Sequence, residues 1–167
     1  TKPMFEKKVH KLKKKTQGEL IIKEYPTASA HSGHFKALLN ELSLKKSFKP
    51  DIIFIDYLNI CASSRYRANS NVNSYSYIKA IAEELRGLAV EANLPIVSAT
   101  QTTRSGYGSS DVDLTDTSES FGLPATADLM FALISTEELE GLNQIMVKQL
   151  KNRYNDPTIY KRFVIGI

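Results

Sequence analysis

The sequence predicts an α/β fold in which a mainly parallel sheet is flanked by helices. Short apolar segments typical of strands alternate along the chain with longer segments in which apolar residues recur every three or four positions. One strand segment, residues 52–55, is wholly apolar, as expected for a parallel strand buried on both faces. Because strands and helices alternate, the connections between strands are expected to be helical crossovers.

The first third of the chain is expected to contain a helix, a strand and a second helix. Apolar residues at positions 5, 9 and 12, set among lysines, predict a helix over residues 5–15. Residues 20–25, Leu-Ile-Ile-Lys-Glu-Tyr, predict a strand that Pro26 closes. Apolar residues at helical spacing predict a helix over 35–44. We expect residues 1–19 to form a basic helical lead-in to a domain over 20–167.

The middle of the chain is expected to hold two central strands and the helix between them. The expected elements are a strand at 52–55, a polar loop at 65–76, a helix at 78–92 and a strand at 96–100. Apolar residues from Ile78 onward follow a period of 3.6 residues, and Asn93-Leu94-Pro95 ends that helix. Each strand is followed at once by a polar residue, Asp56 or Gln101.

The last third is expected to be a loop followed by strands. The expected elements are a Gly- and Ser-rich loop at 102–117 and strands at 128–134, 144–149 and 159–165. Asn155-Asp156-Pro157 is a turn signal between the last two strands.

Composition excludes several classes of protein. Hydrophobic residues make up 42% and charged residues 24% of the 167, which is ordinary for a globular protein. No apolar run approaches the ~18 residues that a membrane span needs. Cys61 is the single cysteine, which excludes an internal disulfide and a Cys-cluster metal site. We expect an intracellular protein in which Cys61 is a buried small residue.

The charge is distributed unevenly along the chain. Residues 1–50 carry twelve Lys and four Glu, a net charge of +8, whereas residues 101–150 carry two cations against eight acids, a net charge of −6. The basic region could meet a polyanion or another acidic surface, and charge alone does not choose between them.

Asp56 and Gln101 are the first candidate site residues. Ligands of parallel sheets bind beyond the carboxyl ends of strands, where both residues are expected to lie. A carboxylate at the end of a rigid strand suits a hydrated magnesium ion beside phosphates, and an amide can bond a phosphate or a water. The alternatives are that Asp56 caps the next turn and that Gln101 merely starts a loop.

Two further groups combine cations with other functional side chains. Lys151 and Arg153 occupy alternate positions, so on a continuing strand both would face the same side and could reach a phosphate; a solvated basic pair is the alternative. Arg65 and Arg67 lie among tyrosines in the polar loop, a mixture that suits nucleic-acid phosphates and bases or an ordinary surface loop equally.

Other motifs are weak or missing. His31 and His34 have the spacing of metal ligands, but no Cys or carboxylate pattern completes a zinc set, so cap or surface histidines are expected. The sequence contains no G-x-x-x-x-G-K-[ST] phosphate loop. If the chain belongs to a nucleotide hydrolase, the main phosphate-binding loop therefore lies outside it.

Taken together, these segments resemble the C-terminal motor of the DnaB-type, RecA-like hexameric replicative helicases, most of all those of T-even phages. Residues 53–58, Ile-Phe-Ile-Asp-Tyr-Leu, are similar to the Walker B strand, and residues 94–101 to the next motif, whose glutamine senses the γ-phosphate. Residues 116–128 match the length of the DNA-binding loop, and residues 148–155 contain the Lys-x-Arg that reaches the neighbouring subunit's nucleotide. The resemblance covers roughly residues 20–167.

The resemblance implies a role for each matching residue. Asp56 would hold Mg²⁺ through water, Gln101 would contact ATP, and Lys151 and Arg153 would act on a nucleotide bound by the next subunit. The residues implied in DNA binding are Arg65, Arg67, Arg104, Ser118, Glu119 and Ser120. Two residues depart from the pattern: Ser118 stands where the family usually has Arg, and Phe121 where it usually has Gly.

The resemblance also implies that the chain is a fragment. The family's Walker A loop and catalytic glutamate are absent from these residues, so the sheet would lack its first, phosphate-loop strand and the isolated chain would be inactive. The implied parent is an ATP-dependent helicase that unwinds DNA in the 5′-to-3′ direction. Its implied partners are single-stranded DNA, identical subunits in a hexameric ring, a primase and a helicase loader, in the cytoplasm of a bacterial host and not at a membrane.

Two alternatives stay open. Another RecA-like ATPase or recombinase would share the sheet and the Walker B strand. A non-catalytic module that binds DNA or protein would explain why the phosphate loop is missing.

Overall fold

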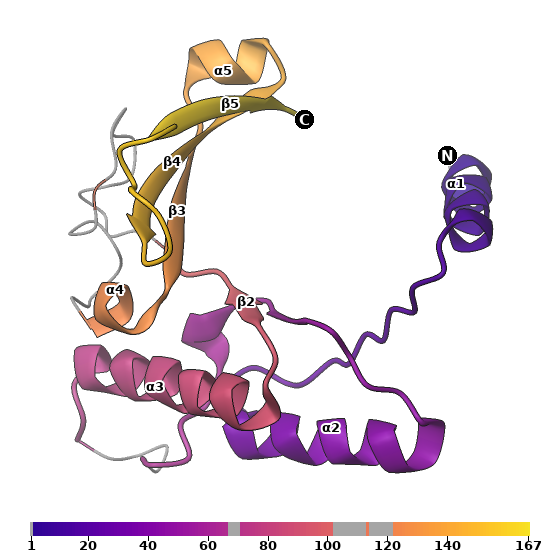
Figure 1. Ribbon diagram of the computed structural model, residues 1–167, viewed down its shortest axis with the longest axis vertical. Helices are drawn as coiled ribbons and strands as arrows, with labels where there is room; N and C mark the ends of the chain where they lie inside the picture. The colour runs from indigo at the N-terminus through magenta and orange to yellow at the C-terminus, as the bar shows by residue number, and fades with distance from the viewer. Residues whose placement is uncertain (1, 67–70, 102–112, 114–121) are drawn as a thin grey trace.

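Helix α3 (Ser74–Ala92) is the element against which most of the core packs. The computed structural model describes residues 2–66, 71–101, 113 and 122–167 (Figure 1), and in it the apolar face of α3 is buried. Asn73 caps its first turn by accepting a hydrogen bond from the Ser76 amide at 2.8 Å. Asn93 ends it in the left-handed conformation, which asparagine tolerates better than most residues. The core cluster combines this helix with residues of neighbouring segments: Leu58, Cys61, Ile78, Ile81, Ala82, Leu85 and Leu123.

Helix α2 (Ser32–Lys46) lies beside α3, and two histidines cap its amino end. The His31 ring accepts a hydrogen bond from the Gly33 amide at 3.0 Å, and the His34 ring accepts one from the His31 amide at 3.2 Å. A Cβ at position 33 would lie 2.8 Å from the His31 ring, so a larger residue there would displace the capping ring. This confirms the expectation that the histidines are caps. Among the described residues, no cluster of His, Cys, Asp and Glu could hold a metal ion.

Strands β1 (Ile53–Ile55) and β2 (Ile96–Ser98) form a parallel pair. Ile53 is opposite Ile96 and Ile55 is opposite Ser98. Helix α3 makes the crossover between the two strands, as parallel pairing requires. The short 3-10 helix η1 (Leu58–Ile60) follows β1 and buries Leu58 beneath α3.

The remaining strands form a separate antiparallel sheet in the order β3-β4-β5 (Figure 1). Its strands are β3 (Leu129–Ile134), β4 (Gln144–Asn152) and β5 (Arg162–Gly166). The short helices α4 (Gly122–Thr126) and α5 (Glu137–Gly141) precede and follow β3. Ala132 and Ile134 form a second small core with Met146 and Leu150.

Most sequence-predicted elements are confirmed, but the mainly parallel sheet is wrong. Within the described residues only β1 and β2 pair in parallel, and the other three strands are antiparallel. The physical reason is chain length: nine residues separate β3 from β4, and nine separate β4 from β5. Connections this short return the chain in the opposite direction, whereas a parallel crossover needs a dozen residues or more.

Two predictions about strands are wrong. Residues 20–25 form no strand, and Leu20 and Ile22 are exposed, because no described strand lies beside them to complete a ladder. Strand β1 is not buried on both faces: Phe54 keeps 69% of its surface exposed. Ile55 packs against the core cluster around α3, whereas no described element covers Phe54.

The helix predicted over residues 5–15 forms as α1 (Lys2–Lys15), but it packs against nothing in the described structure. None of its described residues is buried, and Figure 1 shows it apart from the other elements. Phe5, Val9 and Leu12 are therefore exposed on its apolar side. No helix among the described residues is both long and apolar enough to span a membrane.

The core around α3 predicts how substitutions on that helix affect stability. Ile81 is 1% exposed, so Ile81→Ala should lower the free energy of unfolding by about 2–5 kcal/mol through lost burial and a residual cavity. Val90 lies on the same helix and is 73% exposed, so Val90→Ala should change it by no more than about 0.5 kcal/mol. Denaturant-induced unfolding followed by circular dichroism measures both, and equal effects would contradict the assigned core.

Candidate functional site

The carboxyl ends of β1 and β2 meet at one edge of the parallel sheet. The Leu58 amide donates to the Ala99 carbonyl at 3.0 Å, and the Ser98 hydroxyl donates to the Ile55 carbonyl at 2.8 Å. These bonds extend the contact between the two chain segments past the last paired residues. Asp56 and Gln101, which follow the strands, are both exposed at this edge. The structure therefore places Asp56 directly after β1, as the sequence predicted, and Gln101 three residues after the end of β2, whereas the sequence predicted that the strand runs up to Gln101.

The turn after Asp56 is anchored by its neighbours. The Thr100 hydroxyl donates to the Asn59 side-chain oxygen at 2.8 Å, which ties η1 to the segment that leads to Gln101. Cys61 is a free, buried cysteine, and burial raises the pKa of its thiol. Cys61 is therefore a packing residue, as expected. Asp56 itself has no hydrogen bond or ion pair with any residue that the structure describes.

Glu84, on α3, holds the segment that leaves η1. Its carboxylate accepts hydrogen bonds from the Ser63 hydroxyl at 2.5 Å, from the Ser64 hydroxyl at 2.7 Å and from the Ser64 amide at 2.9 Å. The Ser32 hydroxyl at the start of α2 donates to it at 3.2 Å. Partial burial alone would raise the pKa of Glu84, but the hydrogen bonds from Ser63, Ser64 and Ser32 outweigh burial and hold the pKa below its usual value.

Arg65 is the one predicted DNA-binding residue within the described part of the chain. Its guanidinium forms a 2.5 Å ion pair with Glu83 of α3 and is half exposed. The Ser63 amide donates to the Tyr77 hydroxyl at 3.2 Å, and the Tyr66 and Tyr77 rings lie 6.3 Å apart. Five other predicted DNA-binding residues lie outside the described residues: Arg67, Arg104, Ser118, Glu119 and Ser120.

The end of β4 carries Lys151 and Arg153 beside α4. The Lys151 ammonium donates to the Pro124 carbonyl at 2.5 Å. The Arg153 guanidinium donates to Asp128 at 2.8 Å, just before β3. Lys151 belongs to β4, and Arg153 is the first residue beyond it. Both side chains therefore reach toward the α4–β3 segment, although the two cations have different acceptors.

Sequence reasoning missed the two acids that organise this region and one of their partners. Asp128 also accepts a hydrogen bond from Arg86 of α3 at 3.0 Å. The hydrogen bond from Arg153, with that from Arg86, outweighs the opposing effect of burial and holds the pKa of Asp128 below its usual value. The sequence marks Asp128 only as the end of a loop motif and the start of a predicted strand, and nothing in the local pattern marks Glu84 or Arg86. Their roles depend on contacts 20 to 52 positions apart.

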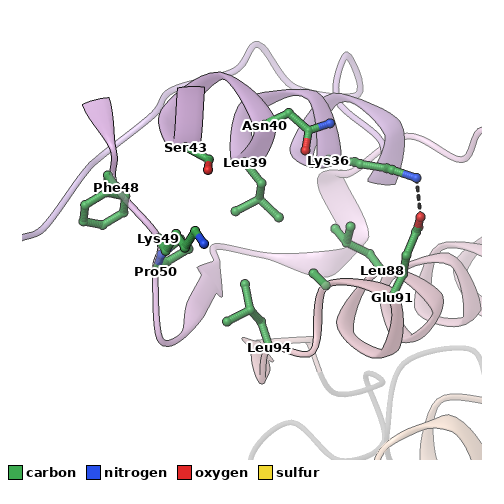
Figure 2. Close-up of a pocket in the computed structure, with 11 residues that line it drawn as sticks. Lys36, Leu39, Asn40, Ser43, Phe48, Lys49, Pro50, Leu88, Glu91 and Leu94 are labelled. Carbon is green, nitrogen blue, oxygen red and sulfur yellow. Dashed lines mark hydrogen bonds and ion pairs between the residues drawn. The ribbon is translucent and has the colours of Figure 1, made fainter. Parts of the chain in front are cut away.

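Two hollows border α3. One, of about 420 Å³, lies between α2 and α3, and Figure 2 shows Leu39, Leu88 and Leu94 among its lining residues with the Lys36–Glu91 ion pair at its rim. Pro50 and Leu94 precede β1 and β2, so this hollow lies at the amino ends of the strands, opposite Asp56 and Gln101. The other, of about 770 Å³, lies between α3 and α4 and includes Arg86 and Arg153. The strand-end site is neither of these hollows.

The chain is similar to one family of known proteins, the replicative DNA helicases. The family model for the DnaB-like helicase C terminal domain matches residues 2–161. The chain is 51% identical over 154 residues to the DnaB-like replicative helicase of Enterobacteria phage T4, a match that covers 92% of this chain and 32% of the phage protein. It is 34% identical over 111 residues to a probable plasmid replicative DNA helicase of Chlamydia psittaci, covering 62% of this chain and 23% of that protein. The chain thus spans about a third or less of the length of these curated relatives.

Solved structures share the fold. One of them, described as an ATPase domain, superposes with a TM-score of 0.64 at 21% identity, covering 81% of this chain and 47% of that one. A DnaB-like replicative helicase, solved in a study of its interactions with primase, gives a TM-score of 0.65 at 20% identity and covers 81% of this chain and 32% of its own. At these identities the comparison shows that the chain shares the fold of these domains.

The hydrogen bonds to Glu84 predict an acid-dependent loss of stability. A carboxylate whose pKa is lowered by folding stabilises the fold above its ordinary pKa of 4.5, and this contribution is lost as pH falls through the lowered value. Glu84→Gln should therefore destabilise the chain at about pH 7 and by much less at about pH 3. Denaturant unfolding at both pH values measures the difference. Glu138→Gln, on α5, is the control and should have no effect at either pH, whereas an equal loss for Glu84→Gln at both would contradict the assignment.

Proposed function

This chain belongs to the DnaB-like helicase C-terminal domain family, and from that membership we propose that it is part of an ATP-dependent replicative DNA helicase. The parent is a hexameric ring that unwinds DNA in the 5′-to-3′ direction. The single observation that supports the assignment of the site is that Asp56 and Gln101 follow two adjacent parallel strands at their carboxyl ends. Ligands of parallel sheets bind at that edge.

Asp56 is the proposed Mg²⁺-binding residue. Its carboxylate is exposed at a strand end and has no partner among the described residues, which fits a hard cation held through water. When bound with ATP, Mg²⁺ neutralises charge on the β- and γ-phosphates. Gln101, on the neighbouring segment, is the proposed γ-phosphate sensor. Its amide can donate to a phosphate oxygen or to a water.

Lys151 and Arg153 are proposed to act on the nucleotide of the next subunit. Arg153 suits this role because its guanidinium stays charged and is 52% exposed beyond the end of β4. Cations of this kind stabilise the charge that develops during phosphoryl transfer. Lys151 is bonded to α4 carbonyls and contributes less.

The proposed DNA contacts lie on two polar segments that follow the strand ends. Arg65, Arg67 and Arg104 would contact phosphates, and Ser118, Glu119 and Ser120 would line the same channel. Single-stranded DNA, identical subunits, a primase and a helicase loader are the proposed partners.

We also propose that the sheet is completed by a strand outside this chain. Among the residues that the structure describes, the parallel β1–β2 pair and the antiparallel β3–β4–β5 sheet are not joined, so β2 and β3 each have an edge with no described partner. Val97 on β2 and Phe131 on β3 are exposed beside these edges. A phosphate-loop strand between them would pair both edges and unite the two sheets. The isolated chain, whose sequence has no such loop, would then lack ATPase activity.

The missing phosphate loop favours one second candidate. This second candidate is a non-catalytic module that binds DNA or neighbouring subunits. The residues proposed to contact DNA and those proposed to contact the next subunit are all present in the chain, whereas the phosphate loop is not.

The proposed magnesium role predicts a selective loss of activity. In the full-length parent, Asp56→Asn should lower ATP turnover on the order of 10²-fold or more, because an amide supplies no negative charge to the cation. Asp51→Asn is the matched control: Asp51 is also exposed but precedes β1, at the opposite end, and its loss should leave turnover near normal. Steady-state ATPase assays with single-stranded DNA compare the two. Near-normal turnover of Asp56→Asn would show that the residue only ends a strand.

The proposed trans role of Arg153 predicts complementation. Arg153→Ala in the parent should lower turnover on the order of 10³-fold, with a smaller loss for Lys151→Ala and little change in nucleotide affinity. Mixing the Asp56→Asn and Arg153→Ala proteins should restore partial activity, because some interfaces then pair an intact Asp56 with an intact Arg153. Subunit exchange is verified separately with labelled protein. Zero activity in rings shown to be mixed would contradict the trans role.

A further inference from the structure

Asp128 lies between two arginines from different parts of the fold. Its Oδ1 atom accepts a hydrogen bond from Arg153 Nη1 at 2.8 Å and another from Arg86 Nη1 at 3.0 Å. Arg86 comes from α3, and Arg153 follows β4. The Oδ1 atom of Asp128 thus links α3 to Arg153, the residue proposed to act across the subunit interface.

The same residue fixes the main chain of Arg153. The Arg153 amide donates to the Asp128 carbonyl at 3.0 Å, and Leu129 is opposite Asn152 in the β3–β4 ladder. Asp128 therefore restrains Arg153 at both its backbone and its guanidinium. Two restraints on one residue limit the directions in which its side chain can point.

Arg86 keeps the carboxylate in place independently of Arg153. Its Nη1 atom also donates to the Thr126 carbonyl at 2.7 Å, so Arg86 is held by two acceptors on the α4–β3 segment. If Arg153 turned toward a phosphate, Asp128 would still have a cationic partner. The Asp128 carboxylate would then still be paired with Arg86 and would stay in its place when Arg153 moves.

The contact with Asp128 leaves most of the guanidinium available. Within the described structure Arg153 uses a single nitrogen on Asp128, whereas a guanidinium offers five N–H donors in a planar fork. Its side chain is half exposed at the edge of the hollow between α3 and α4. The remaining donors can therefore face a ligand while one edge of the fork is fixed.

We propose that Asp128 is a positioning residue that orients Arg153 toward the nucleotide of the neighbouring subunit, and that Arg86 holds Asp128 in place. The proposal rests on the trans role of Arg153 given above. Neither Asp128 nor Arg86 touches the nucleotide. Their effect is to present the guanidinium in one orientation before the interface forms, which lowers the cost of orienting it during the reaction.

The test measures kcat and KM for ATP in full-length parent rings with single-stranded DNA. Asp128→Ala should lower kcat about 10- to 100-fold, because a displacement of about 1 Å of a positioned group can cost on the order of 10²-fold, while KM changes less than about twofold. Asp128→Glu, which restores a carboxylate, should recover most of kcat. Arg86→Gln should lower kcat less than Asp128→Ala does. Glu91→Gln, which removes an acid from another ion pair of α3, is the control and should leave both constants unchanged.

A double variant separates positioning from a general structural effect. If Asp128 acts only through Arg153, adding Asp128→Ala to Arg153→Ala should cause no further loss of kcat. An additional loss of similar size in the double variant, or a normal or increased kcat in Asp128→Ala, would overturn the proposal. Asp128→Asn, which keeps the shape of the side chain, replaces Asp128→Ala if the latter does not assemble into rings.

The same series distinguishes failure of this proposal from failure of the proposed function. If Arg153→Ala retains normal turnover, the trans role itself is wrong, and Asp128 has nothing to position. If Arg153→Ala is inactive but Asp128→Ala is normal, the trans role stands and the positioning role is wrong.

Discussion

The parallel pairing of β1 with β2 is the constraint on which the candidate site depends. Because Ile55 is opposite Ser98, the residues that follow the two strands leave the sheet at the same edge. The bond from the Leu58 amide to the Ala99 carbonyl keeps the segments together beyond the strands. A slip of one residue would reverse which face each strand side chain occupies. The proposed roles of Asp56 and Gln101 thus follow from the register of only three residue pairs.

Helix α3 supports this pairing and also connects it to the second sheet. Its apolar face supplies the core residues Ile81 and Leu85, while polar positions of the same helix hold segments on either side. Glu84 binds the serines that follow η1, and Arg86 binds Asp128 before β3. One helix therefore fixes the chain after Asp56 and the neighbourhood of Arg153. Helix α3 thus contacts both sheets, which share no backbone pairing within the described residues.

The sequence was sufficient for features that depend on local pattern and not for those that depend on distant contacts. The period of α3, the strand before Asp56 and the turn between β4 and β5 all leave local signals, and the structure confirms them. The prediction of a strand at residues 20–25 is wrong because a strand forms only beside a partner strand, and the local sequence pattern does not show whether a partner is present. The exposed Phe54 has the same cause: an apolar residue indicates burial only if another element covers it. For the site, the positions of Asp56 and Gln101 follow from the strand pattern, whereas the Arg86–Asp128–Arg153 contacts arise from folding and could not be predicted.

The most direct test of the account is a structure of the full-length ring with Mg²⁺ and a non-hydrolysable ATP analogue. The central claim is that the strand ends of one subunit and the end of β4 of the next share one nucleotide. We expect Asp56 to lie beside the magnesium hydration shell, and an Arg153 nitrogen of the adjacent subunit to lie about 2.7–3.2 Å from a γ-phosphate oxygen. A ring in which Arg153 contacts only its own subunit while the nucleotide is bound at every interface would contradict the claim.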